Sequence, residues 1–214
     1  MRSRFDEQLA QLNREMIEMG AQCEEVIALA SKALTEADMK LAAKVAPLSA
    51  DIDRKEREIE ALCLRLLLQQ QPVARDLRQI SAALKMITDL ERIGDQAEEI
   101  ADIIGFIDGH NPEDYVTLTE MAKAAIHMVT ESIDAYVKHD TMLAEKVVDE
   151  DDIVDEYFLQ VKSKLIAKIA KDPDDGEYAL DLLMIAKYFE RIGDHAVNIA
   201  EWVIFSVTGV HSGE

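Results

Sequence analysis

Two pairs of acidic residues in this 214-residue chain have a spacing that would let a helix hold a cation. Glu91 and Asp95 form the first pair, and Glu190 and Asp194 form the second. Residues four apart lie on the same face of an α-helix, so each pair presents two carboxylates side by side. Carboxylate oxygens are hard ligands, which suit Mg, Mn or Fe better than copper or structural zinc. The spacing therefore predicts a cation site on each of two helices.

Other acidic side chains can extend these sites. Asp102 and Glu201 continue the acidic line farther along the same two helices. Asp53 and Asp155 each follow an apolar residue of another segment, which places them at the edge of a buried seam. The candidate metal ligands are therefore Glu91, Asp95, Glu190, Asp194, Asp53, Asp155, Asp102 and Glu201.

A solvated acidic face is the simpler interpretation of such spacing, because Arg92 and Arg191 could pair with these acids in place of a metal. The duplication favours the metal, since both pairs lie in the sequence Glu-Arg-Ile-Gly-Asp, at 91–95 and 190–194. The glycine of each motif costs about 1 kcal/mol relative to alanine inside a helix. A close helix approach or a kink beside the carboxylates would compensate for that cost, and so would a tight packing notch without any ligand.

Long helices are the elements that must position these residues. Apolar residues recur at alternating steps of three and four through six segments of the chain, and only 8 Gly and 4 Pro interrupt them. The acidic motif recurs after about 100 residues, which indicates an internal repeat. We therefore expect an all-α fold of two tandem antiparallel three-helix bundles, with one domain over residues 1–110 and a second over residues 111–214.

Local signals place the boundaries of these helices. Pro72 breaks the chain before the third helix, and that helix should end near Asp108-Gly109. Asn111, followed by proline and two acids, should cap the fourth helix. Thr35 with Asp38 three positions later predicts a capping box at the start of the second helix.

Composition and charge exclude several classes of partner. The formal net charge of -20 repels nucleic acids and anionic lipid, whose binding draws on clustered Lys and Arg. The two cysteines, Cys23 and Cys63, lie in apolar helical patterns and are expected to be buried free thiols. No apolar run approaches the roughly 18 residues of a membrane span. We therefore expect a cytoplasmic protein without a transmembrane segment.

Enzyme classes find little support in the sequence. A ferritin-like di-iron enzyme needs Glu-x-x-His pairs, and none of the five histidines has a glutamate three positions before it. No glycine-rich phosphate loop or nucleophile arrangement is present either. His195, beside the second acidic pair, is expected to be hydrogen-bonded or exposed rather than a ligand. The sequence favours a non-enzymatic protein, with a metal-free helical adaptor and a carboxylate-bridged metal enzyme as alternatives.

Several motifs together resemble the PhoU family of phosphate-transport regulators. They are Gln71-Pro72, Asp76-Leu77-Arg78, Leu90 followed by the first Glu-Arg-Ile-Gly-Asp, and the second copy of that motif. The resemblance covers essentially the whole chain, including the six-helix order and the repeat.

The resemblance implies a cytoplasmic negative regulator that signals phosphate sufficiency between a phosphate ABC transporter and a membrane sensor histidine kinase. It also implies a pair of three-helix bundles, a homodimer, and multinuclear metal sites at the two Glu-x-x-x-Asp motifs. By position those motifs are Glu91 with Asp95 and Glu190 with Asp194. The other four candidate ligands come from helix geometry alone.

Overall fold

The computed structural model describes residues 2–69, 73–107 and 112–210. Within these ranges the chain is helical and contains no strand. The first half comprises α1 (Arg2–Glu36), the single-turn α2 (Met39–Ala42), α3 (Val45–Gln69) and α4 (Ala74–Ile104). The second half comprises α5 (Pro112–Lys138), α6 (Thr141–Lys171), the 3-10 turn η1 (Pro173–Asp175) and α7 (Gly176–Thr208). The predicted break at Pro72, helix end at Asp108-Gly109, cap at Asn111 and domain boundary between residues 110 and 111 lie outside the described residues.

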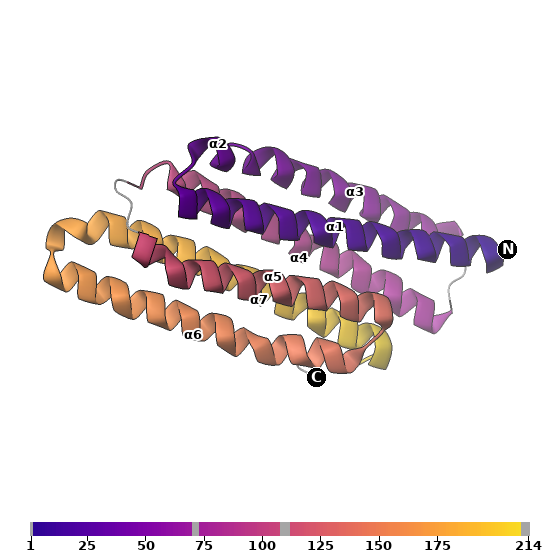
Figure 1. The fold of residues 1–214 in the computed structure, drawn as a ribbon. Coiled ribbons are helices and arrows are strands. Elements are labelled where there is room, and N and C mark those ends of the chain that lie inside the picture. The colour runs from indigo at the N-terminus through magenta and orange to yellow at the C-terminus, as the bar shows by residue number, and fades with distance from the viewer. Residues whose placement is uncertain (1, 70–72, 108–111, 211–214) are drawn as a thin grey trace.

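The two halves form three-helix bundles that pack against each other along their length (Figure 1). Helices α3, α4, α7 and α6 contact one another in that order, while α1 packs on α3 and α4, and α5 packs on α6 and α7. Contacts between α4 and α7 and between α1 and α5 join the halves. The expected all-α architecture of two three-helix bundles is therefore confirmed. No helix among the described residues is apolar over enough of its length to cross a membrane.

Both halves enter their second helical segment through the same turn. Asp38 accepts hydrogen bonds from the backbone N–H groups of Lys40 and Leu41, and Asp140 accepts one from that of Leu143. The predicted capping box at Thr35 is wrong, because α1 continues to Glu36 and the Thr35 hydroxyl donates to a carbonyl inside α1. Asp38 alone supplies the cap, and the segment that follows it is split into α2 and α3.

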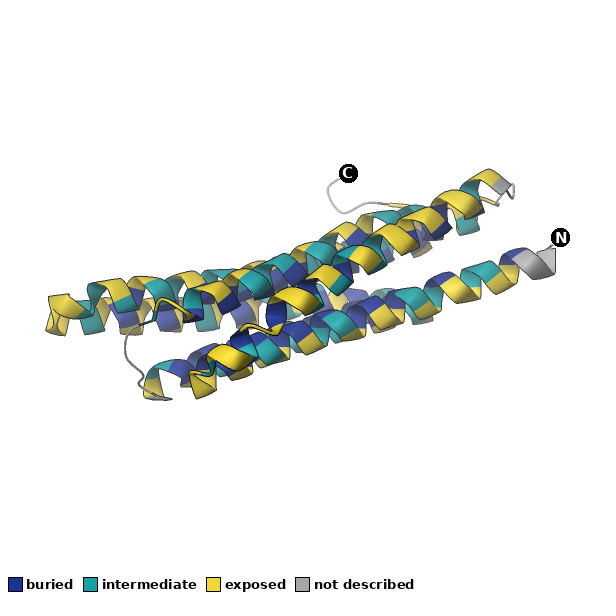
Figure 2. Cartoon of the chain, turned by 90° about the horizontal axis from the view of Figure 1, so that it is seen from above, coloured by how far each residue is buried: buried dark blue, intermediate teal, exposed yellow. Residues whose placement is uncertain are grey.

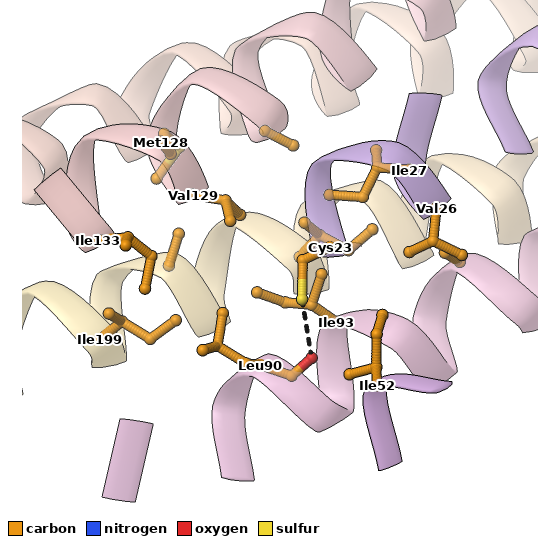
Figure 3. Packing of buried hydrophobic residues seen from close by; sticks show 14 of the residues in the cluster. Cys23, Val26, Ile27, Ile52, Leu90, Ile93, Met128, Val129, Ile133 and Ile199 are labelled. Atoms are coloured by element: carbon orange, nitrogen blue, oxygen red, sulfur yellow. Dashed lines mark hydrogen bonds between the residues drawn. The ribbon is translucent and has the colours of Figure 1, made fainter. Parts of the chain in front are cut away.

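One hydrophobic core runs through both bundles (Figure 3). Buried residues follow the inward stripe of the helices, and exposed residues lie on the outer faces (Figure 2). Gly20 lets α1 approach α5 closely, since an added Cβ would lie 2.9 Å from Ile133 Cγ1. Cys23 and Cys63 are buried free thiols, as expected, and Cys23 donates to the Leu90 carbonyl at 3.3 Å. The core therefore continues across the junction of the two bundles.

Candidate metal centre

The first acidic cluster lies where α3 meets α4. Asp53 on α3 and Glu91 and Asp95 on α4 each offer one carboxylate oxygen, and these oxygens all lie within 4.8 Å of one another. All three residues are half-buried. The structure thus brings together both residues of the first predicted pair and the acid predicted from the neighbouring helix.

Gly94 makes this convergence possible. A Cβ on Gly94 would lie 3.2 Å from Cδ1 of Ile52 and 3.4 Å from Oγ of Ser49, so α3 rests almost directly on the α4 backbone. Helix α4 runs unbroken from Ala74 to Ile104, so the glycine serves a close approach and not a kink. Asp53, next to Ile52, is thereby held against the carboxylates of α4.

The charges at this cluster are only partly compensated. Arg92 Nη1 lies 3.0 Å from Asp95 Oδ2, and Arg92 Nε lies 3.5 Å from Glu91 Oε2. Burial, followed by the charge of Asp95, raises the pKa of Glu91 above its ordinary value, and Arg92 opposes this shift. Oδ1 of Asp53 is buried without a hydrogen-bond partner among the described residues. A buried anionic oxygen without a partner is costly, so the donor set fits a cation.

A second acidic cluster lies at the matching junction of α6 and α7. It joins Asp155, Glu190 and Asp194 to Asp151, a residue that the sequence reasoning missed. The pKa of Asp151 is raised to about 6, mainly by burial and further by the charges of the three other acids. Oδ1 of Asp151 is buried and unpartnered among the described residues, and a Cβ on Gly193 would lie 3.2 Å from it.

This second cluster is more open than the first, and among its described residues no three ligand atoms lie within 4.8 Å of one another. Asp155 and Asp194 are exposed, and Glu190 is half-buried and paired with Lys187. The spacing of Asp151 and Asp155, four residues apart on α6, could have indicated the missed ligand. Comparison of the two halves hid it, because the equivalent residue on α3 is Ser49.

Comparison with known proteins accounts for the repeated arrangement. The family model described as "PhoU domain" matches residues 16–104 and again residues 118–203. The chain belongs to the PhoU family. Its curated relatives are named accessory proteins of phosphate-specific transport systems.

Individual PhoU relatives match along nearly their whole length. The phosphate-specific transport system accessory protein PhoU homolog of Clostridium acetobutylicum is 34% identical over 207 residues, covering 96% of this chain and 94% of the relative. The crystal structure of PhoU from Pseudomonas aeruginosa has a TM-score of 0.90 and 35% identity, covering 96% of this chain and 100% of that chain. PhoU from Streptococcus pneumoniae has the same TM-score at 25% identity, covering 98% and 100%.

Two of the predicted ligands of this PhoU-family chain lie apart from the clusters. Asp102 is exposed and lines an open hollow of about 430 Å³ between α4 and α7, together with Tyr188 and Arg191. Glu201 is half-buried near the end of α7. Neither belongs to the described groups around Asp53 and Asp151.

His195 has a different role from that of a ligand. Its Nδ1 lies 2.9 Å from Asp89 Oδ1, and Asn198 donates to the same oxygen at 3.1 Å. Tyr188, which precedes His195 on α7, donates at 3.4 Å to Glu99, which follows Asp89 on α4. These bonds show that α4 and α7 run antiparallel and tie the halves together.

A mixed group on α5 and α6 also escaped the sequence reasoning. His127, Glu131 and Glu150 offer ligand atoms within 4.8 Å of one another. Lys146 already lies there, with Nζ 2.8 Å from Glu131 Oε2 and 3.1 Å from Glu150 Oε1. The ammonium group offsets the charge of these carboxylates, while Oε2 of Glu150 is buried without a partner among the described residues.

Proposed function

We propose that this chain is a cytoplasmic negative regulator of phosphate uptake and of phosphate-starvation signalling, and that it links a phosphate ABC transporter to a sensor histidine kinase. The observation that carries the proposal is the match to PhoU along both bundles. Relatives at 34–35% identity are named accessory proteins of phosphate-specific transport systems. The helical surfaces offer docking faces, and the protein acts by restraining its partners.

Removing the gene tests the regulatory role directly. In phosphate-replete medium we expect the deletion strain to take up more radiolabelled phosphate than its parent, and a plasmid copy of the gene to restore the parental rate. Affinity capture of the tagged chain should recover transporter components and the kinase. The same capture from a strain that lacks the transporter genes serves as the control. An unchanged uptake rate in the deletion strain, together with no capture of either partner, would refute the proposal.

Each carboxylate cluster is proposed to hold a Mg, Mn or Fe ion. The support comes from the two buried oxygens without partners, on Asp53 and Asp151, and from the excess of negative charge around them. The ion would neutralise the acids that face each other across α3 and α4 and across α6 and α7. The eight predicted ligands reduce to six in these clusters plus Asp151, while Asp102 and Glu201 contribute to the field outside them.

Metal content separates this proposal from a metal-free adaptor. The double variant Glu91→Gln with Glu190→Gln removes one ligand from each cluster. We expect it to lose the cation that the wild-type protein retains after purification, as measured by plasma mass spectrometry. The control, Glu25→Gln with Glu145→Gln, makes the same charge change at exposed positions. Equal metal content in the wild type and the cluster variant would favour the adaptor.

The proposed assembly is a homodimer, as the family resemblance implies. Sedimentation equilibrium of the full chain should give twice the 24.0 kDa chain mass, and a mass that stays at one chain at high concentration would argue against it. A carboxylate-bridged metal enzyme is less favoured, because neither cluster contains a histidine.

A further inference from the structure

A polar cavity lies far from both acidic clusters, where α4 begins, α5 turns into α6, and α7 ends. It has a volume of about 300 Å³ and is lined by Arg75, Gln79, His139, Ser206 and Val207. No acidic residue is among these described lining residues, although the chain has 43 Asp and Glu against 23 Lys and Arg. The cavity is therefore a basic site in a strongly acidic protein.

Arg75 is followed by an acidic residue, Asp76, in the first turn of α4 but forms no described ion pair with it. Neither Arg75 nor Arg78 forms an ion pair with a carboxylate among the described residues. Arg78 does not line the cavity, and its Nε lies 3.5 Å from the carbonyl of Ser206, a lining residue. Burial and, after it, the charge of Arg75 lower the pKa of His139 below its ordinary value. The charge of Arg75 therefore acts on the imidazole.

A buried amide forms part of the cavity wall. Gln79 is only 8% exposed, and its amide donates one hydrogen bond to Asn13 Oδ1 at 3.1 Å. The same side chain lies beside Tyr136 and opposes the effect of burial on the pKa of that phenol. Burial raises the pKa of Tyr136, which is enclosed in the core behind Gln79 and is not among the lining residues of the cavity. Gln79 therefore gives the cavity a buried polar wall that its internal contacts hold in place.

The first half of the chain has an internal control for this cavity. Ala37 occupies the turn position equivalent to His139, and both have positive φ, at 48° and 53°. The cavity at that end of the first bundle, about 180 Å³, is lined largely by apolar residues, including Leu34, Ala37 and Ile104. The fold of the turn does not require a histidine, so His139 needs another explanation.

We propose that the cavity at Arg75, Gln79 and His139 binds a tetrahedral oxyanion, inorganic phosphate. Guanidinium and imidazole groups form strong charge-assisted hydrogen bonds with phosphate oxygens, and arginine can do so with two parallel bonds. The positive end of α4 lies at the same place, because α4 begins at Ala74 without a side-chain cap. The choice of phosphate over other oxyanions rests on the proposed function, whereas the anion site itself does not.

Isothermal titration calorimetry of the full chain tests the site, with inorganic phosphate and with sulfate as separate titrants. We expect one phosphate per chain, bound more tightly than sulfate. Arg75→Gln should weaken phosphate binding at least about tenfold through loss of a charge-assisted contact. His139→Ala should weaken phosphate binding as well. It introduces alanine, the residue that the equivalent turn of the first half contains at Ala37. Arg54→Gln, an exposed arginine on α3, is the charge-matched control and should leave affinity unchanged.

Phosphate held by a bound cation is distinguished by the same titration on the Glu91→Gln and Glu190→Gln protein after chelation. Binding that persists there and falls in Arg75→Gln supports the cavity. Three results would overturn the proposal. The first is the absence of binding heat at about 10 mM phosphate, because binding that needs more phosphate than this is too weak to be specific. The others are equal affinity of Arg75→Gln and wild type, and loss of phosphate binding when the acidic clusters are altered. Sulfate bound as tightly as phosphate would overturn the assignment to phosphate. Each of these results is independent of the uptake rate in the deletion strain, so the two proposals fail separately.

Discussion

Removing the charge of Asp151 should make the metal-free protein more stable. Its pKa of about 6, against an ordinary 3.8, corresponds to about 3 kcal/mol of unfavourable free energy for the charged form at neutral pH. The carboxyl group is only half-buried, and solvent screens part of the repulsion, so about 1–2 kcal/mol is a realistic gain. Asp151→Asn also places an amide donor beside the carboxylates of Asp155, Glu190 and Asp194.

The pH dependence of this gain has a definite sign. A carboxyl whose pKa is raised in the folded state binds protons more tightly there than in the unfolded chain, so its charge destabilises the fold as pH rises. The penalty is complete above about pH 6 and absent well below 3.8. We therefore expect urea unfolding of chelator-treated protein to give Asp151→Asn a free energy of unfolding about 1–2 kcal/mol higher than that of the wild type at pH 7. This difference should shrink toward zero near pH 4.

Added cation should reverse this order. A bound ion stabilises the wild type by about 2.7 kcal/mol at a concentration 100 times its Kd, and Asp151→Asn has lost a ligand for it. Asp151→Ser introduces the residue that the first half has at Ser49. It should behave like Asp151→Asn, both without metal and with added cation. Asp149→Asn, at an exposed position on the same helix, is the control and should change stability by less than about 0.5 kcal/mol. A metal-free Asp151→Asn protein that is less stable than wild type at pH 7 would refute the electrostatic reasoning.

Two further substitutions test how the halves are joined. Gly20→Ala places a methyl group 2.9 Å from Ile133 Cγ1, so overpacking of about 1–3 kcal/mol should outweigh the roughly 1 kcal/mol gain in helix propensity and lower the unfolding midpoint. Gly176→Ala meets nothing within 4 Å and should leave the midpoint unchanged or raise it; equal midpoints for the two variants would contradict this reasoning. Asp89→Ala removes the acceptor of His195 and should cost about 1–2 kcal/mol in calorimetric stability, and a neutral result would mean that this bond contributes nothing to the junction.

Helix periodicity predicts most of the fold because each buried stripe must face a partner. The repeat at 91–95 and 190–194 identifies the two central helices, α4 and α7, and the glycines within it mark where α3 and α6 approach most closely. Local capping chemistry was less informative. Thr35 has the residue type of a cap but bonds within α1, since the helix continues for another residue past it.

The candidate site was predictable only as far as the halves agree. Asp53, Glu91 and Asp95 could be grouped from spacing on two helices, and the structure brings their oxygens within 4.8 Å of one another. Asp151 could not be found by matching, because its counterpart is Ser49. The assignment of metal to these oxygens remains a prediction, and the basic cavity around Arg75 depends on helix ends that periodicity does not place.

The differences between the halves carry the chemistry that the shared scaffold leaves open. Positions that the backbone requires are the same in both, as with the capping aspartates Asp38 and Asp140, which stabilise identical turns. The residue before each cap has the same strained φ but a different side chain, alanine at 37 and histidine at 139. A turn that accepts alanine has no structural need for an imidazole facing an arginine. Selection on binding explains that histidine better than selection on folding, because its burial beside Arg75 disfavours the protonated imidazole and provides no compensating contact within the described chain.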